Sequence, residues 1–149
     1  MGFSIYYTAK RTAPLTPAEV QRIDTIVQSF DVAADIERYA HKGKGLNWES
    51  FTLYEMSRLT GEAVLSGATA LPDNKPFAMH KGARHWVDCL NRIRREALPD
   101  AKWSVQIEDD DGRVVGYAYA GRFAPRAAYR WATEVSVYLA GDFRRRGGG

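Results

Sequence analysis

The fold of this chain is decided by residues 77–98, which read FAMHKGARHWVDCLNRIRREAL. Apolar side chains recur there at every third or fourth position, the spacing that gathers them on one face of an α-helix. Pro99 follows directly, and proline does not continue a helix. We therefore predict a long helix over residues 77–98. Its buried line comprises Met79, Ala83, Trp86, Leu90, Ile93 and Ala97.

A shorter helix is predicted upstream, where Thr16, Pro17, Ala18 and Glu19 form a capping box. The Thr16 side chain accepts from the backbone N–H three residues on, Glu19 reaches back, and proline suits the first helical position. The buried stripe that follows comprises Val20, Ile23, Val27 and Phe30. We expect residues 31–40 to continue as a second helical piece, which the nearby glycines at 43 and 45 end.

Strands are predicted wherever β-branched and aromatic residues alternate with polar ones between turn-forming residues. The predicted strands are residues 3–10, 46–57, 63–71, 103–108, 114–120 and 131–139. Over residues 3–108 the order is therefore strand, helix, strand, strand, helix, strand. This order predicts an α+β fold, a ferredoxin-like βαββαβ two-layer sandwich with a C-terminal β-strand extension. We expect one domain over residues 1–140 and a flexible Arg/Gly tail over residues 141–149.

Composition limits the class of protein. The chain has 149 residues, of which 45% are hydrophobic and 26% charged, and a net charge of +3, values typical of one globular domain. No apolar run approaches the roughly 20 residues of a transmembrane helix. Residues 1–10 also lack the apolar stretch of a signal peptide. The sequence therefore predicts a cytoplasmic protein with no membrane partner.

One pair of residues is a candidate for catalysis. His85 and Cys89 lie four positions apart on the predicted helix, where their side chains can touch, and a neighbouring imidazole can lower the pKa of a thiol. Cys89 also lies at the edge of the buried stripe, where a small apolar residue packs well. Structural packing is the favoured interpretation, and a small enzyme using His85 and Cys89 is an alternative.

Other motifs give no site for a metal or a cofactor. The acidic turn at residues 108–112 lacks the end ligands of a calcium loop. Residues 43–45 read Gly-Lys-Gly, but Trp48 stands where a dinucleotide fingerprint needs its third glycine. The chain has a single cysteine, which excludes an internal disulfide and a thiol-rich zinc site. We therefore expect no cofactor.

The open face of the predicted sheet is the first candidate docking surface. If helices cover one face only, alternation along the strands sends Tyr6, Trp48 and Tyr54 to the other face. Three large aromatic rings facing water are typical of a binding surface, unless residues 113–139 or a second copy of the chain cover them.

The outer face of the long helix is the second candidate surface. It carries Lys81, Arg84, Arg92 and Arg95, within a basic stretch that precedes an acidic one. Such a charged face suits an acidic partner or a polyanion. Asp88 and Glu96 are spaced to pair with some of these arginines, which also fits a simple solvated surface.

Because no acid, base, nucleophile and metal ligands converge, we predict a small, non-catalytic bacterial recognition module. It would bind a protein partner, as immunity and adaptor proteins do, or a second copy of itself. The candidate partner-binding residues are Tyr6, Trp48, Tyr54, Lys81, Arg84, Arg92 and Arg95. A nucleic-acid-binding domain using Arg84, Arg92 and Arg95 is an alternative. Residues 63–69 carry no aromatic side chain, although RNA-binding domains of this architecture do there.

Overall fold

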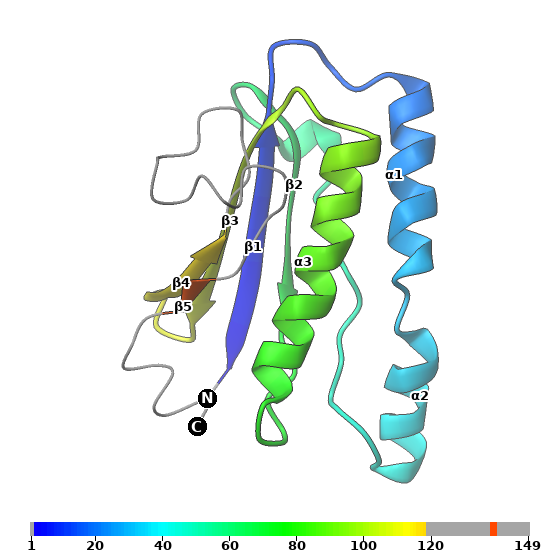
Figure 1. The fold of residues 1–149 in the computed structure, drawn as a ribbon, viewed down its shortest axis with the longest axis vertical. Helices are drawn as coiled ribbons and strands as arrows, with labels where there is room; N and C mark the ends of the chain where they lie inside the picture. Colours follow the sequence, from blue (N-terminus) through cyan, green and yellow to red (C-terminus); the bar gives the residue numbers. More distant parts are fainter. Residues whose placement is uncertain (1, 119–137, 140–149) are drawn as a thin grey trace.

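The computed structural model describes residues 2–118 and 138–139. Its elements in chain order are β1 (Phe3–Lys10), α1 (Pro17–Ser29), α2 (Ala33–Lys42), the 3₁₀ helix η1 (Met56–Arg58), β2 (Ala63–Ala70), α3 (Ala78–Glu96), β3 (Lys102–Asp109), β4 (Val114–Ala118) and β5 (Tyr138–Leu139) (Figure 1). The predicted α+β class is confirmed. The predicted loop at residues 121–129, the tail at 141–149 and most of the last strand lie outside the described residues, so the domain boundaries stay predictions.

The sheet is antiparallel throughout. Its strands pair in the order β2-β1-β3-β4-β5. Strand β1 lies between β2 and β3, so that Tyr7 is opposite Gly67 on one side and Val105 on the other. Because side chains alternate along a strand, Ile5, Tyr7 and Ala9 share one face, and all three are buried.

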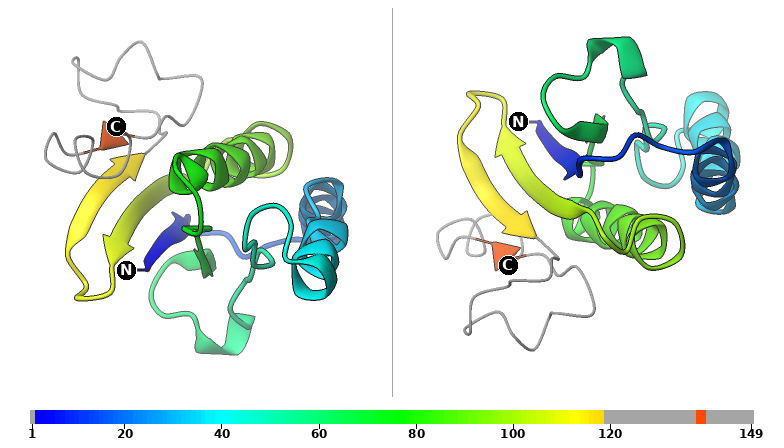
Figure 2. Two further views of the ribbon diagram at one scale, coloured as in Figure 1. Left: turned by 90° about the horizontal axis from the view of Figure 1, so that it is seen from below. Right: turned by 90° about the horizontal axis from the view of Figure 1, so that it is seen from above.

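Helix α3 covers the buried face of the sheet, and α1 and α2 lie farther from it (Figure 2). The buried line predicted for α3 is confirmed, because every member is nearly inaccessible to solvent and Trp86 is only 1% exposed. Helix α1 packs beside α3 and buries Ile23 and Ile26. The core therefore lies between the sheet and α3. Among the described helices, none combines the length and apolar character that crossing a membrane requires.

The start of α1 is fixed by the predicted capping box. The Glu19 backbone N–H donates to Thr16 Oγ1 at 3.1 Å, and the Thr16 N–H donates to Glu19 Oε1 at 2.8 Å. Arg11, just after β1, also pairs with Glu19 and lies 3.2 Å from the Asp100 carboxylate. The Arg11 guanidinium, helped by the Thr16 backbone, lowers the pKa of Glu19 to about 2. This carboxylate therefore joins the end of β1 to the start of α1.

Residues 46–57, predicted to be the second strand, form no strand. One isolated bridge joins Leu53 to Gly67 of β2. The rings of Trp48 and Phe51 both pack against Trp86, with centroids 6.0 and 5.5 Å from it. Two residues three positions apart lie on opposite faces of a strand, so this packing is incompatible with the predicted strand. The ferredoxin-like βαββαβ order is therefore not confirmed.

The pairing of Glu19 makes a prediction about stability in acid. Its lowered pKa means that the ionised carboxylate stabilises the fold above its ordinary pKa of 4.5, and that this contribution is lost as the pH falls to about 2. We expect the native chain to be more stable than Glu19→Gln at pH 6, and the difference to disappear between about pH 5 and 2. Urea unfolding followed by circular dichroism at stepped pH measures it.

The matched control is Glu49→Gln, which changes an exposed carboxylate in the same way. It should show little difference from the native chain at any of these pH values. If the stability difference between the native chain and Glu19→Gln persisted undiminished at pH 2, it would not come from the ionised Glu19 carboxylate.

Candidate functional site

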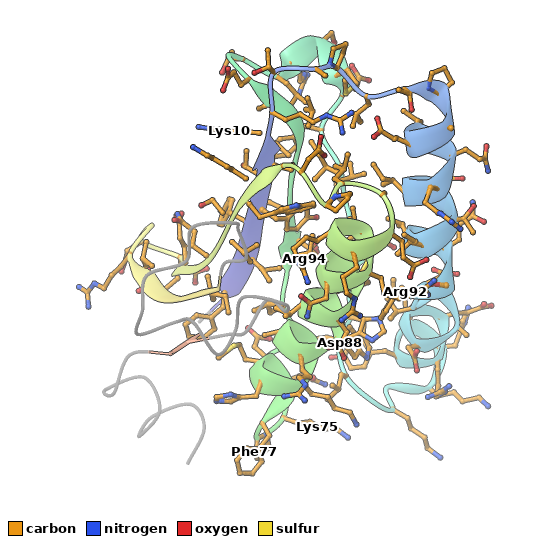
Figure 3. The ribbon with its side chains drawn as sticks, turned by 45° about the horizontal axis from the view of Figure 1, so that its top comes forward. Lys10, Lys75, Phe77, Asp88, Arg92 and Arg94 are labelled. Atoms are coloured by element: carbon orange, nitrogen blue, oxygen red, sulfur yellow. The ribbon has the colours of Figure 1, made fainter. Side chains whose placement is uncertain are left out.

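The three aromatic residues predicted to share an open face are not together. Tyr6 lies on the sheet face away from α3, as does Lys10 four residues later, which points away from α3 in Figure 3. Trp48 lies on the opposite face, edge-on to Trp86. Tyr54 is 43% exposed, and its N–H donates to the Ser66 carbonyl oxygen at 2.8 Å. The predicted aromatic surface is therefore wrong, because residues 46–57 do not alternate as a strand would.

The four predicted basic residues all lie on α3, but Arg92 is built into the packing of the helices. Its Nε donates to Glu96 at 2.9 Å, and its Nη1 donates to Ser29 Oγ of α1 at 3.0 Å. Its guanidinium also lies 5.9 Å from the Phe30 ring centroid. Figure 3 shows Arg92 on the side of α3 that faces α1. Lys81, Arg84 and Arg95 are exposed, and their role in binding stays a prediction.

The proposed catalytic pair is not formed. His85 donates from Nε2 to the Phe30 carbonyl oxygen at 2.8 Å, and its ring lies against Trp48 and Trp86. Cys89 is 0% exposed, and burial raises the pKa of its thiol to about 12. A thiol of this kind stays protonated at neutral pH and is a poor nucleophile. The structure therefore contradicts the alternative of an enzyme using His85 and Cys89.

A buried network around Tyr7 holds residues 46–57 against the sheet. The Tyr7 hydroxyl donates to the Thr52 carbonyl oxygen at 2.6 Å and lies 2.8 Å from Thr69 Oγ1. Thr69 Oγ1 also accepts from the Thr52 N–H at 3.3 Å. The Phe51 ring stacks on the Tyr7 ring with centroids 4.6 Å apart. Burial raises the pKa of the Tyr7 phenol, so it stays a hydrogen-bond donor at neutral pH.

The segment held in this way forms one wall of an open groove. The opposite wall is α1, and β2 lies at the base. The groove has a volume of about 310 Å³. Four lining residues are large hydrophobic ones with exposed fractions between 38% and 52%: Val20, Leu53, Tyr54 and Met56. Asp24 of α1 is the one carboxylate among the described lining residues. This groove is the candidate binding site. The sequence did not indicate it, because one wall was predicted to be a strand.

Comparison with known proteins finds a partial similarity. No family model matches the chain, and no solved structure is significantly similar. Over 55 residues, however, the chain is 42% identical to a phosphinothricin N-acetyltransferase from Alcaligenes faecalis. The matched region is 37% of this chain and 28% of that protein, so the chain spans well under half the length of its relative.

This similarity corrects the functional prediction. The relative is named for an N-acetyl transfer reaction, whereas we predicted a non-catalytic module that binds a protein. This partial similarity to a named N-acetyltransferase contradicts the predicted recognition module, together with protein binding as its main role.

Burial of Cys89 predicts slow alkylation. At neutral pH, iodoacetamide should modify the folded chain at least about 100-fold more slowly than the chain in urea, because a thiol with a raised pKa has very little thiolate. Mass spectrometry over time reads this directly, since the chain has one cysteine. His85→Gln should leave the slow rate unchanged. Equal rates for the folded and the unfolded chain would show an accessible, reactive thiol.

The Tyr7 network makes a prediction about stability. Tyr7→Phe removes the donor to the Thr52 carbonyl oxygen and leaves buried polar atoms with fewer partners. We expect the free energy of unfolding in urea to fall by about 1–3 kcal/mol. Tyr6→Phe is the control, because it removes the same hydroxyl from the neighbouring exposed position. A similar effect of both substitutions would mean that the network does not hold the segment.

Proposed function

We propose that the chain functions in N-acetyl transfer, in which an acetyl group moves from a thioester donor to the nitrogen of a small primary amine. Coenzyme A is the common carrier of acetyl thioesters. The similarity to the N-acetyltransferase carries this proposal. It concerns only part of each protein, so the proposal extends to the class of acceptor, a primary amine, and to nothing more specific.

The chemistry of this reaction fits a chain whose described residues include no paired nucleophile and base. The neutral amine nitrogen attacks the thioester carbonyl carbon, a C–N bond forms and the C–S bond breaks. The departing sulfur takes up the proton that the nitrogen loses, which gives an amide and a free thiol. The protein's main tasks are to hold the two substrates in contact and to stabilise the negative oxygen of the transition state.

The groove beside α1 supports the proposal through its size. Pockets for small molecules have volumes of about 300–1,000 Å³ and mainly apolar walls. The groove encloses about 310 Å³ and has such walls. A groove of this size would accommodate a small acceptor. The Tyr7 network holds one wall of that place to the sheet.

The test is an acetyl-transfer assay with the full chain. The purified protein is incubated with acetyl-coenzyme A and either phosphinothricin or one of a panel of small primary amines. We expect an N-acetylated product by mass spectrometry, and one equivalent of free thiol per product. Omitting the amine measures thioester hydrolysis, and heat-unfolded protein measures the uncatalysed reaction. If no acceptor gives more product with folded protein than with unfolded protein, the proposal is wrong.

A further inference from the structure

We propose that the groove between α1 and residues 51–56 binds an organic amine with an apolar body. Its apolar walls would hold the body, and the Asp24 carboxylate would hold the ammonium group. This inference rests on the proposed function in one respect, since such an amine would be the acceptor of the acetyl group. The binding itself is argued from the groove alone.

Exposed apolar residues are concentrated at this groove. Among the described residues, eight large hydrophobic ones are exposed, and four of them, Val20, Leu53, Tyr54 and Met56, line it. Single exposed hydrophobic residues are ordinary on a protein surface, but a contiguous group marks a place where an apolar ligand binds. The four come from two segments, α1 and the stretch after Thr52, so they meet only in the folded chain.

The walls are held in place before any ligand arrives. Phe51, at the groove, stacks on Tyr7, and the neighbouring Thr52 is bonded to Tyr7 and Thr69. On the other side, Ile23 of α1 is 4% exposed and anchors the helix in the core. A site that is already formed loses less conformational entropy on binding, which favours a small ligand.

The charge of the groove selects a cation. Val20, Asp24 and Val27 are spaced at i, i+4 and i+7, so they lie on one face of α1, and all three line the groove. Asp24 Oδ2 accepts from Gln28 Nε2 at 3.1 Å, and no described cationic side chain pairs with Asp24 in an ion pair. A carboxylate beside apolar walls complements an ammonium group on a hydrocarbon body and repels an anion.

The test compares two ligands of nearly the same shape, 2-phenylethylamine and 2-phenylethanol, of which only the first is charged at pH 7. Titrations of the full chain are followed by nuclear magnetic resonance. We expect saturable shifts at Val20, Asp24 and Leu53, with the amine bound about fivefold more tightly than the alcohol. Absence of saturable shifts at these residues up to millimolar amine would overturn the inference.

Three variants separate the charge from the apolar walls. Asp24→Asn should abolish the preference for the amine while keeping the alcohol affinity. Leu53→Ser should weaken the binding of both ligands and keep the preference for the amine over the alcohol. Asp88→Asn, which changes a carboxylate on α3 (Figure 3), should change neither. An unchanged preference in Asp24→Asn, or an equal loss in Asp88→Asn, overturns the role of Asp24.

Two further outcomes distinguish this inference from the proposed function. If the amine binds saturably, Asp24→Asn weakens this binding and no acetyl transfer is detected, the result supports amine binding in the groove and contradicts the proposed transferase function. If acetyl transfer is detected and neither Asp24→Asn nor Leu53→Ser changes it, the result supports the proposed transferase function and contradicts the groove as the acceptor site. The mass of the protein in light scattering could also rise with its concentration, with the amine binding only at low concentration. This result would mean that the groove binds a second copy of the chain, and it would overturn the inference.

Discussion

The hydroxyl group of Tyr7 joins three parts of the chain that are far apart in sequence. It donates to the Thr52 carbonyl oxygen and contacts Thr69 of β2, while the ring of the same residue stacks on Phe51. Buried polar atoms are costly when unpaired, so these contacts favour one position of the segment strongly. Gly67 permits the close approach, because a Cβ there would strike the Thr52 carbonyl oxygen and lie 2.6 Å from Tyr7 Cε2. The groove beside α1 depends on this arrangement.

Those elements with strong local signals could be predicted from the sequence. The capping box at Thr16 and the apolar line of α3 are properties of neighbouring residues, so both appear in the structure. Residues 46–57 could not be predicted in this way. Alternating residues there satisfy the pattern of a strand, but the packing of Trp48 and Phe51 on Trp86 is a tertiary contact. Tertiary packing therefore overrode local preference at the segment that mattered most.

The candidate site was missed for two physical reasons. The groove exists only because α1 and residues 51–56 meet, and nothing local in the sequence brings Val20 beside Leu53 and Met56. The proposed reaction class offers no local signal either. Acetyl transfer to an amine depends on substrate positioning more than on a nucleophile or a metal, so a residue pair such as His85 and Cys89 would not mark it. The proposal comes instead from the partial similarity to an N-acetyltransferase.

The position of residues 46–57 is the claim on which the groove depends, and proton–proton distances in solution test it most directly. The stacking of Phe51 on Tyr7 predicts strong nuclear Overhauser contacts between the two rings, and contacts of the Trp48 ring with Trp86. Regular Hα–Hα contacts between residues 46–57 and β2, as two antiparallel strands give, would contradict the account. The segment would then extend the sheet, and its side chains would not form the wall of a groove.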